Sequence, residues 1–406
     1  MPAHFQLNRK MTDPNRTTIG SLFPELDREL RTLSGEFTTG ILPSQTIDQF
    51  IAGGRIHAYL KIRGEQVQPA SLDLRLGNVA YRVRASFLPG KQCTVASKIE
   101  KYCMHQLDLT RPAVLERGCV YIVPLIEELT LPAGYWGKAN PKSSTGRLDI
   151  FTRLITDGST AFESVPNGYR GKLYIEVVPR TFSVLVQEGT SLTQLRLIRG
   201  NPPPSDAALS ALDKREPIVI GSSAEPGVAV IADGLRLSVH LSGDGPNAIV
   251  GYRARRHAPV IDVGKIGYYD AQDFWDPVFA TPDRTLILDP DDFYILSSKE
   301  RIRVPPSFSA SMVAYDPSVG EFRIHYAGFF DPGFGCGSQG ANGAKAVLEV
   351  RSHEVPFLLE DGQIVGRLIY ERMLEPPSKT YSVGIGSSYQ SQGLALSKHF
   401  RGANPQ

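Results

Sequence analysis

The chain carries one stretch of sequence twice: Leu173-Tyr174-Ile175-Glu176-Val177 returns as Ala346-Val347-Leu348-Glu349-Val350, so that the two glutamates lie 173 residues apart. Each copy is a short apolar run of the kind that forms a buried strand, with one carboxylate near its end. Identical residues recur at the same offset along the surrounding sequence. They are Leu115/Leu288, Tyr121/Tyr294, Glu127/Glu300, Pro132/Pro305, Leu185/Leu358, Gly189/Gly362 and Leu195/Leu368. A register kept over this length predicts two related domains in tandem.

Short strands separated by turns dominate the rest of the pattern. Residues 71–76 alternate apolar and polar side chains, and 121–125, 172–178 and 182–186 are further β-rich runs between Gly, Pro and Asn clusters. Such a pattern favours a β-barrel or jelly roll over an alternating α/β sheet. We therefore predict a mainly β chain of two β-barrel or jelly-roll domains with short helices, one of which begins within residues 44–50.

The domain boundaries follow from the repeat and from a Gly-Asn-Pro-Pro-Pro run that starts at Gly200. We expect a flexible leader over residues 1–35, a first domain over 36–200 and a linker over 201–216. The second domain then covers 217–406. A length of 406 residues accommodates two domains of this size.

The composition limits the kinds of partner. A net charge of +2 without a basic cluster argues against binding to nucleic acid or to an anionic membrane. No apolar run is long enough for a membrane span and residues 1–16 are polar, so we expect a cytoplasmic protein. The four cysteines are scattered and form no C-x-x-C motif, so we expect reduced, mostly buried thiols and no zinc–thiolate site.

A dense group of hydrogen-bond donors lies in the first copy, at Pro141-Lys142-Ser143-Ser144-Thr145-Gly146-Arg147. Two adjacent hydroxyls, backbone N–H groups beside a glycine and nearby cationic side chains suit phosphate oxygens. The alternative is a turn in which the serines cap a helix or strand. In the second copy the 173-residue offset places Asp316, Pro317 and Gly320 at the positions of Ser143, Ser144 and Arg147, so these donors are lost.

The second copy has its own distinctive string, Tyr326-Ala327-Gly328-Phe329-Phe330-Asp331-Pro332-Gly333-Phe334-Gly335. Asp-Pro-Gly after an apolar run is a tight turn. A hairpin there can offer backbone N–H and C=O groups to an aromatic base, and the simpler reading is a β-hairpin without a ligand.

Taken in order, these motifs resemble the dCTP deaminase family of the dUTPase-like superfamily, in its long, duplicated bacterial form. The resemblance covers most of residues 40 to 400. It rests on five stretches: 69–77 (PASLDLRLG), 142–148 (KSSTGRL), 327–334 (AGFFDPGF), 348–349 (LE) and 389–393 (YQSQG).

The resemblance implies hydrolysis of the 4-amino group of dCTP without zinc, giving dUTP for thymidylate synthesis, and two dUTPase-like barrel domains. Glu349 matches the position of the family's water-activating glutamate, and Glu176 is a second candidate. Ser143, Ser144 and Arg147 match the phosphate and reaction-centre motif, in which Lys142 replaces an arginine and loses its bidentate fork.

The resemblance also implies a base-side hairpin and a closing tail. Ala327, Gly328, Phe329 and Asp331 belong to the hairpin, and Tyr381, Tyr389 and Gln392 belong to the C-terminal tail that folds over the nucleotide. Mg2+ would arrive with the triphosphate, held mainly through phosphate oxygens and waters. The family further implies a homo-oligomer such as a trimer and dTTP as an inhibitor.

A carboxylate mechanism also follows from what the sequence lacks. Zinc deaminases carry H-x-E with P-C-x-x-C, whereas none of the eight histidines here has a glutamate two positions later. A glutamate must then take the proton from the water that attacks C4 and pass it towards the leaving ammonia. The alternative for a buried strand glutamate is a structural ion pair with a neighbouring Arg or Lys.

Because the phosphate motif is kept in the first copy and the hairpin in the second, we hypothesise one working site per chain that combines both copies and uses Glu349. The competing arrangement keeps Glu176 catalytic beside the serines of its own copy. Two other functions stay open: a dUTP diphosphatase or bifunctional enzyme that uses Asp73 or Asp331 to position water, and a regulatory protein that binds nucleotide without turnover.

Overall fold

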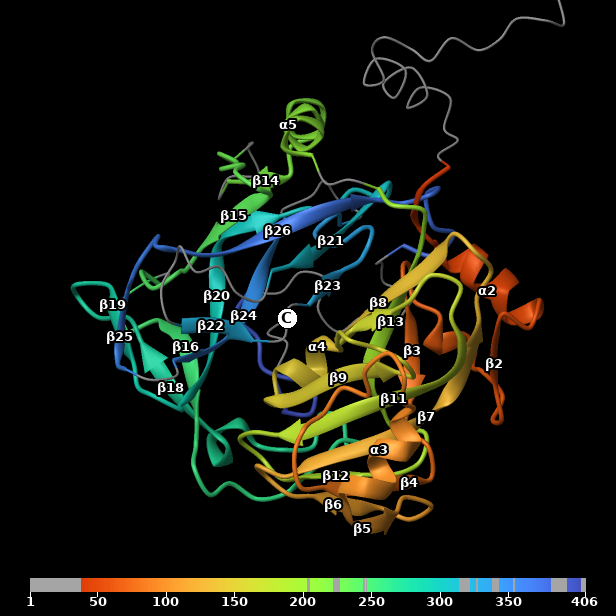
Figure 1. The fold of residues 1–406 in the computed structure, drawn as a ribbon. Helices are drawn as coiled ribbons and strands as arrows, with labels where there is room; N and C mark the ends of the chain where they lie inside the picture. The colour runs from red at the N-terminus through yellow and green to blue at the C-terminus, as the bar shows by residue number, and fades with distance from the viewer. Residues whose placement is uncertain are drawn as a thin grey trace, which may run out of the picture. The chain divides into compact units, whose positions relative to one another are not determined.

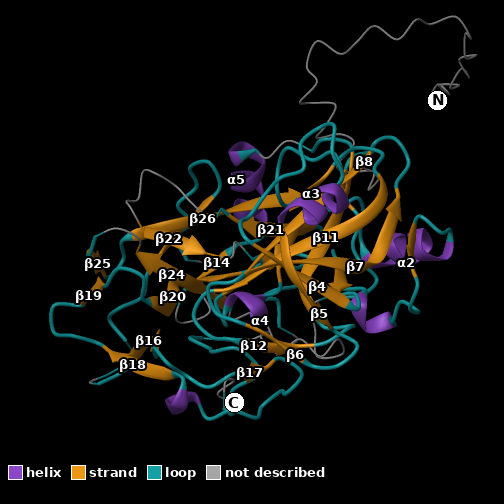
Figure 2. Ribbon diagram, turned by 60° about the horizontal axis from the view of Figure 1, so that its bottom comes forward, coloured by secondary structure: helices purple, strands orange, loops and turns teal. Residues whose placement is uncertain are grey.

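The chain folds into small, mostly antiparallel sheets joined by turns (Figures 1 and 2). The computed structural model describes residues 38–202, 205–221, 227–243, 245, 247–313, 328–337, 343–352, 355–380 and 393–402, and the backbone of 322–325. The first copy contributes β1 (Gly40–Ile41), α2 (Ser44–Ala52), β2 (Ile56–Ala58), η1 (Gly64–Gln66), β3 (Leu72–Arg75), β4 (Val79–Val83), α3 (Val95–Tyr102), β5 (Cys103–Asp108), β6 (Ala113–Leu115), β7 (Val120–Thr130), β8 (Tyr135–Pro141), α4 (Ser143–Gly146), β9 (Ile150–Thr156), β10 (Ser164–Val165), β11 (Arg170–Pro179), β12 (Val184–Val186) and β13 (Ser191–Arg199).

Helix α5 (Asp206–Arg215) falls within the predicted linker, and the Ser205 hydroxyl caps its N-terminus by accepting a hydrogen bond from the Ala208 N–H at 3.2 Å. The second copy contributes β14 (Val219–Ile220), β15 (Leu235–Ser238), β16 (Ile249–Ala254), β17 (Ile261–Asp262), η2 (Ala271–Asp273), β18 (Trp275–Phe279), β19 (Thr285–Leu288), β20 (Phe293–Ile302), β21 (Phe308–Met312), β22 (Phe322–His325), β23 (Phe329–Phe330), β24 (Ala344–Ser352), β25 (Phe357–Glu360) and β26 (Ile364–Arg372).

The two copies share one topology. The order β5-β4-β7-β11-β9 in the first copy returns as β18-β16-β20-β24-β22, and the β6–β12 pair returns as β19–β25. Strand β3 pairs with β13 beside β8, just as β15 pairs with β26 beside β21. The turns before β13 and β26 each hold a glycine, Gly189 and Gly362, with the same left-handed φ of 83°, which glycine adopts without strain. The repeat in the sequence is therefore a repeat of structure.

One side-chain contact is also repeated. The Glu116 N–H donates to the Tyr121 hydroxyl oxygen at 3.1 Å, and the Asp289 N–H donates to that of Tyr294 at 3.2 Å. Both tyrosines are buried, so each phenol satisfies a main-chain donor at the start of the longest strand of its sheet.

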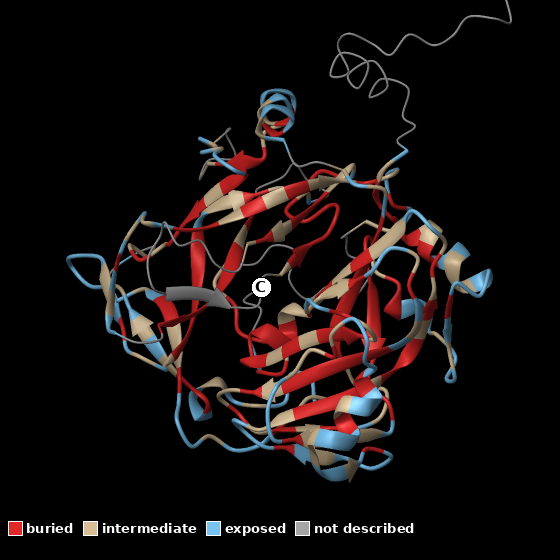
Figure 3. Cartoon of the chain, in the orientation of Figure 1, coloured by how far each residue is buried: buried red, intermediate tan, exposed pale blue. Residues whose placement is uncertain are grey.

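The central strands of both copies are buried (Figure 3), and apolar side chains from the two copies pack into a common cluster. Phe182 of the first copy lies 5.7 Å from Phe274 of the second, measured between ring centroids. Phe274 in turn lies 5.4 Å from Phe400, near the C-terminus. Strand β17 also pairs with β12 of the first copy, so the copies share both core and sheet.

The mainly β architecture with short helices is confirmed, as is a helix at 44–50. The predicted leader lies outside the described residues. All four cysteines are free, but Cys93 is exposed and the other three are half-buried, so the expectation of mostly buried thiols was wrong. Thiols are weakly polar and tolerate half-exposed positions. In the described part of the chain, no helix is both long and apolar enough to cross a membrane.

Candidate active site

Glu349 lies in the middle of the second copy's main sheet. It is on β24, opposite Ile295 of β20 on one side and His325 of β22 on the other. The residue is only 6% exposed. This burial raises the pKa of Glu349 to about 8, and the nearby positive charge of Arg147 only partly offsets the effect. A carboxyl group with this pKa exchanges a proton close to neutral pH.

Arg147 reaches this carboxyl group from the first copy. It follows α4, and its Nε lies 4.0 Å from Oε1 of Glu349, with both side chains almost fully buried. Because this guanidinium comes from one copy and the carboxylate from the other, the pair exists only where the two copies meet.

The C-terminal segment 393–402 completes the surroundings of Arg147. The guanidinium Nη1 donates to the carbonyl oxygens of Ala395 at 3.2 Å and Leu396 at 3.4 Å. The Ser397 hydroxyl donates to the carbonyl oxygen of Ser144 on α4 at 2.8 Å. The segment that follows the predicted closing tail therefore contacts the predicted phosphate-binding motif directly. The tail residues Tyr381, Tyr389 and Gln392 lie outside the described residues.

The two adjacent serines form the first turn of α4. Ser143 is half-buried and Ser144 is 8% exposed. Lys142 is the N-cap residue of this short helix, and no side-chain hydrogen bond caps it. The serine hydroxyls are therefore not used as helix caps.

Lys142 contacts Asp73 of β3. Its ammonium group donates a hydrogen bond to the Asp73 carboxylate, which is buried. Burial raises the pKa of Asp73, and the Lys142 charge partly offsets this. The same cluster includes Lys398, whose pKa is lowered by burial and by repulsion from Lys142. The Asp73 carboxylate therefore compensates the positive charge of Lys142, a residue of the predicted phosphate-binding motif.

Glu176 occupies the equivalent strand position in the first copy but has different neighbours. It is fully buried, and its Oε1 accepts hydrogen bonds from Arg153 Nε at 2.9 Å and Nη2 at 2.6 Å. The Arg153 guanidinium also lies 3.6 Å above the centre of the Phe162 ring. The ion pair considered as the alternative for a buried strand glutamate is thus present at Glu176.

The predicted base-side hairpin is held by a buried arginine of the first copy. Arg196 Nη2 lies 3.3 Å from the Asp331 carboxylate, and its guanidinium carbon lies 4.0 Å from the centre of the Phe329 ring. Gly328 accepts a hydrogen bond from the Met312 N–H at 3.1 Å through its carbonyl oxygen. Ala327 lies outside the described residues. The Asp331 side chain therefore joins the two copies.

The sequence reasoning missed three buried polar residues around this site: Arg196, Ser397 and His399. Arg196 could have been recognised in the sequence, because it interrupts the apolar run 195–198. The equivalent residue of the second copy, 173 positions later, is the apolar Ile369. His399 Nδ1 lies 2.9 Å from the Ser397 hydroxyl oxygen, and burial lowers its pKa to about 4. No local spacing signals that contact.

We also searched the described residues for a metal-binding site. Within the described ranges, no three His, Cys, Asp or Glu side chains are grouped so that they could hold a metal ion. The prediction of a zinc-free reaction stays a prediction.

Residues 38–201 match the 2'-deoxycytidine 5'-triphosphate deaminase (DCD) N-terminal domain, and residues 205–400 match the C-terminal domain of the same family. A solved structure, the 2'-deoxycytidine 5'-triphosphate deaminase from Agrobacterium tumefaciens, is 52% identical with a TM-score of 0.78. The match covers 83% of this chain and 100% of that one. The chain belongs to the 2'-deoxycytidine 5'-triphosphate deaminase family.

Other relatives match shorter parts of the chain. A "dCTP deaminase, dUMP-forming" of Halobacterium salinarum is 31% identical over 120 residues, which are 29% of this chain and 57% of that protein. A "dCTP deaminase" of Natronomonas pharaonis is 27% identical over 127 residues, 30% of this chain and 60% of that protein. The chain thus spans less than two thirds of the length of these relatives.

The contrast between the two glutamates predicts opposite effects on stability. The folded chain raises the pKa of Glu349 from 4.5 to about 8, so the unfolded state releases this proton first and the wild type loses stability as pH rises from about 4.5 to 8. Glu349→Gln should match the wild type near pH 5 and exceed its free energy of unfolding at pH 8.5 by on the order of a few kcal/mol. Urea unfolding at both pH values measures this.

Glu176→Gln is the matched control. It removes the charge partner of the Arg153 guanidinium and should destabilise the chain at pH 8.5 by about 3–5 kcal/mol. Equal destabilisation by both substitutions at pH 8.5 would contradict this distinction, in which the charge of Glu349 is only partly compensated and that of Glu176 is paired with Arg153.

Proposed function

We propose that the chain hydrolyses dCTP to dUTP and ammonia, with Glu349 as the general base. The observation that carries the proposal is the Glu349 carboxyl group, buried with a pKa near 8 and 4.0 Å from Arg147 of the other copy. The 52% identity to the Agrobacterium tumefaciens deaminase supports dCTP as the substrate.

In the proposed reaction, ionised Glu349 takes a proton from a water molecule as its oxygen attacks C4 of the cytosine. The protonated carboxyl group gives this proton to N3, so that C4 carries both a hydroxyl and the amino group. Glu349 then takes the hydroxyl proton and passes it to the 4-amino nitrogen. The C4–N bond breaks, ammonia leaves, and a C4 carbonyl and an N3–H remain. A base works best when its pKa lies near the working pH, and burial gives Glu349 this property.

Arg147 keeps the charge of the site balanced. Its guanidinium Nε lies 4.0 Å from Oε1 of Glu349, and its positive charge favours the ionised form of Glu349 without removing the raised pKa. The two carbonyl oxygens of the C-terminal segment fix the guanidinium in place. Arg147 therefore acts on the reaction centre through charge and position.

For the nucleotide, we propose that the hydroxyls of Ser143 and Ser144 and the ammonium group of Lys142 bind the triphosphate, with Mg2+ arriving on the phosphate oxygens. Ala327, Gly328 and Phe329 would line the base side through main-chain groups. Tyr381, Tyr389 and Gln392 would cover the bound nucleotide.

The family resemblance supports three further parts of the proposal. The chain would form a homo-oligomer such as a trimer, dTTP would inhibit it, and it would act in the cytoplasm. Each is separable from the chemistry of the Glu349 site.

Ammonia release from dCTP by Glu349→Gln and Glu176→Gln tests the proposed base. Loss of a general base typically lowers the rate by about 10²- to 10⁴-fold, so Glu349→Gln should fall by this much in kcat. Glu176→Gln should keep its activity wherever it is folded, because Arg153 occupies that carboxylate. Equal, partial losses in both variants would overturn the single-base proposal. No ammonia from the wild type, with tight dCTP binding, would favour the regulatory alternative.

A second candidate function is a bifunctional enzyme that continues to dUMP. It is favoured by the relatives from Halobacterium salinarum and Beutenbergia cavernae, both named "dCTP deaminase, dUMP-forming". Against it, Asp73 contacts Lys142 and Asp331 contacts Arg196, so both carboxylates considered for positioning water have cationic partners.

Chromatography of the dCTP reaction separates the two products. We expect dUTP to accumulate in proportion to ammonia, with no pyrophosphate. Appearance of dUMP and pyrophosphate at the rate of ammonia release would instead establish the bifunctional reaction.

A further inference from the structure

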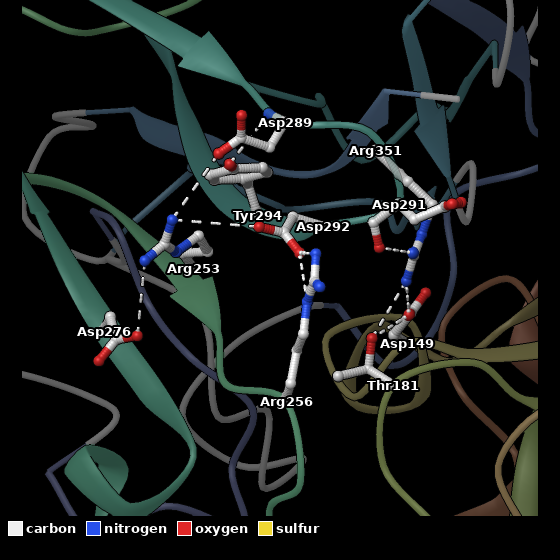
Figure 4. Close-up of polar contacts among 10 residues, drawn as sticks. All are labelled: Asp149, Thr181, Arg253, Arg256, Asp276, Asp289, Asp291, Asp292, Tyr294 and Arg351. Atoms are coloured by element: carbon white, nitrogen blue, oxygen red, sulfur yellow. Dashed lines mark hydrogen bonds and ion pairs between the residues drawn. The ribbon is translucent and has the colours of Figure 1, made fainter. Parts of the chain in front are cut away.

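A second contact between a guanidinium and a carboxylate joins the two copies close to the Arg147–Glu349 pair. Arg351 of β24 donates through Nη2 to the carboxylate of Asp149 and, at 3.1 Å, to the hydroxyl of Thr181 (Figure 4). The side chains of Arg351 and Asp149 are 5% and 1% exposed. This pair is therefore as deeply buried as Arg147 and Glu349.

The two pairs are linked through the backbone on both sides. Glu349 and Arg351 are alternate residues of one strand, so their side chains leave the same face of β24. Arg147 and Asp149 flank Leu148 directly after α4. The polarity is reversed: the first copy supplies the cation to one pair and the anion to the other.

Both members of the second pair are themselves fixed. Asp149 has a left-handed φ of 55°, its N–H donates to the Gly146 carbonyl at 2.8 Å, and its carbonyl accepts from the Arg180 N–H at 2.9 Å. Arg351 also donates through Nη1 to the carbonyl oxygen of Asp291. A displacement of the loop after α4 would therefore have to break several buried contacts.

We propose that Asp149 and Arg351 are positioning residues that hold Arg147 against Glu349. The inference rests on the proposed function, in which these two groups form the reaction centre. Asp149 and Arg351 act through the backbone of the loop and of β24. Asp149 lies two residues after Arg147, and Arg351 lies two residues after Glu349. Any shift of α4 relative to β24 would therefore change the 4.0 Å separation between Arg147 and Glu349.

Three variants test this role: Asp149→Asn, Arg351→Met and the two combined. Each single change leaves one buried charge without its partner and should lower the thermal midpoint. We expect kcat to fall by about tenfold to a hundredfold with little change in KM, since a misplacement of about 1 Å in a site has this effect. As Arg147 recedes, the pKa of Glu349 rises, so the acid limb of the kcat/KM profile should move to higher pH.

The double variant separates positioning from stability. It removes both charges, so its thermal midpoint should recover towards that of the wild type, while the low kcat and the shifted pH profile should persist. Recovery of kcat together with the midpoint would overturn the positioning role. Asp361→Asn is the control, because it removes an 8%-exposed carboxylate that pairs with Lys299 at 2.8 Å in the turn before β26. It should lower the midpoint and leave the pH profile unchanged.

Crystal structures of the single variants give a readout that does not depend on deamination. We expect the Arg147 Nε–Glu349 Oε1 separation to exceed that of the wild type. An unchanged separation would overturn the inference even in an active enzyme. Absence of ammonia from the wild type would overturn the proposed function and leave the structural test in force.

Discussion

The candidate active site depends on one interaction, the burial of the Glu349 carboxyl group against the Arg147 guanidinium at the junction of the two copies. Removing a carboxylate from water is unfavourable unless a cation or donors compensate it. Here the compensation is partial, because the separation is 4.0 Å and Arg147 also donates to carbonyl oxygens of the C-terminal segment. The result is a carboxyl group with a raised pKa rather than a closed ion pair. The second copy supplies the acid, and the first copy supplies the charge that tunes it.

The first copy shows what full compensation looks like at the same strand position. Glu176 accepts two hydrogen bonds from Arg153, which lies opposite it on β9. In the second copy the residue opposite Glu349 is His325, and the arginine comes instead from the other copy. The two copies thus carry the same carboxylate on equivalent strands, and the neighbouring cation determines how far the charge of each carboxylate is compensated.

Much of this could be predicted from sequence. The 173-residue offset relates Gly189 to Gly362 and Tyr121 to Tyr294. The structure repeats the turn at each glycine and the buried phenol of each tyrosine. Such features can be predicted because they depend on local backbone geometry. The likeness of the motifs to dCTP deaminases was enough to indicate the family. The division of the reaction centre between copies was a hypothesis, and the proximity of Arg147 and Glu349 is the geometry that it requires.

Contacts between distant segments could not be predicted. Asp149 and Arg351 are 202 residues apart, and Arg196 reaches Asp331 across 135 residues. The periodicity of apolar residues along the sequence does not indicate which distant residues pair. Asp331 was predicted to bind nucleotide, and that stays a prediction. The contact of its carboxylate with a buried arginine of the first copy was not foreseen. Sequence patterns report which faces are apolar, and packing between the copies decides which cation meets which carboxylate.

The number of nucleotides bound per chain tests the central claim most directly. Calorimetric titration of the Glu349→Gln protein with dCTP and Mg2+ measures this number without turnover. A site built jointly by the two copies predicts one nucleotide per chain. Two equivalent nucleotides per chain would contradict it, because each copy would then hold a complete site of its own.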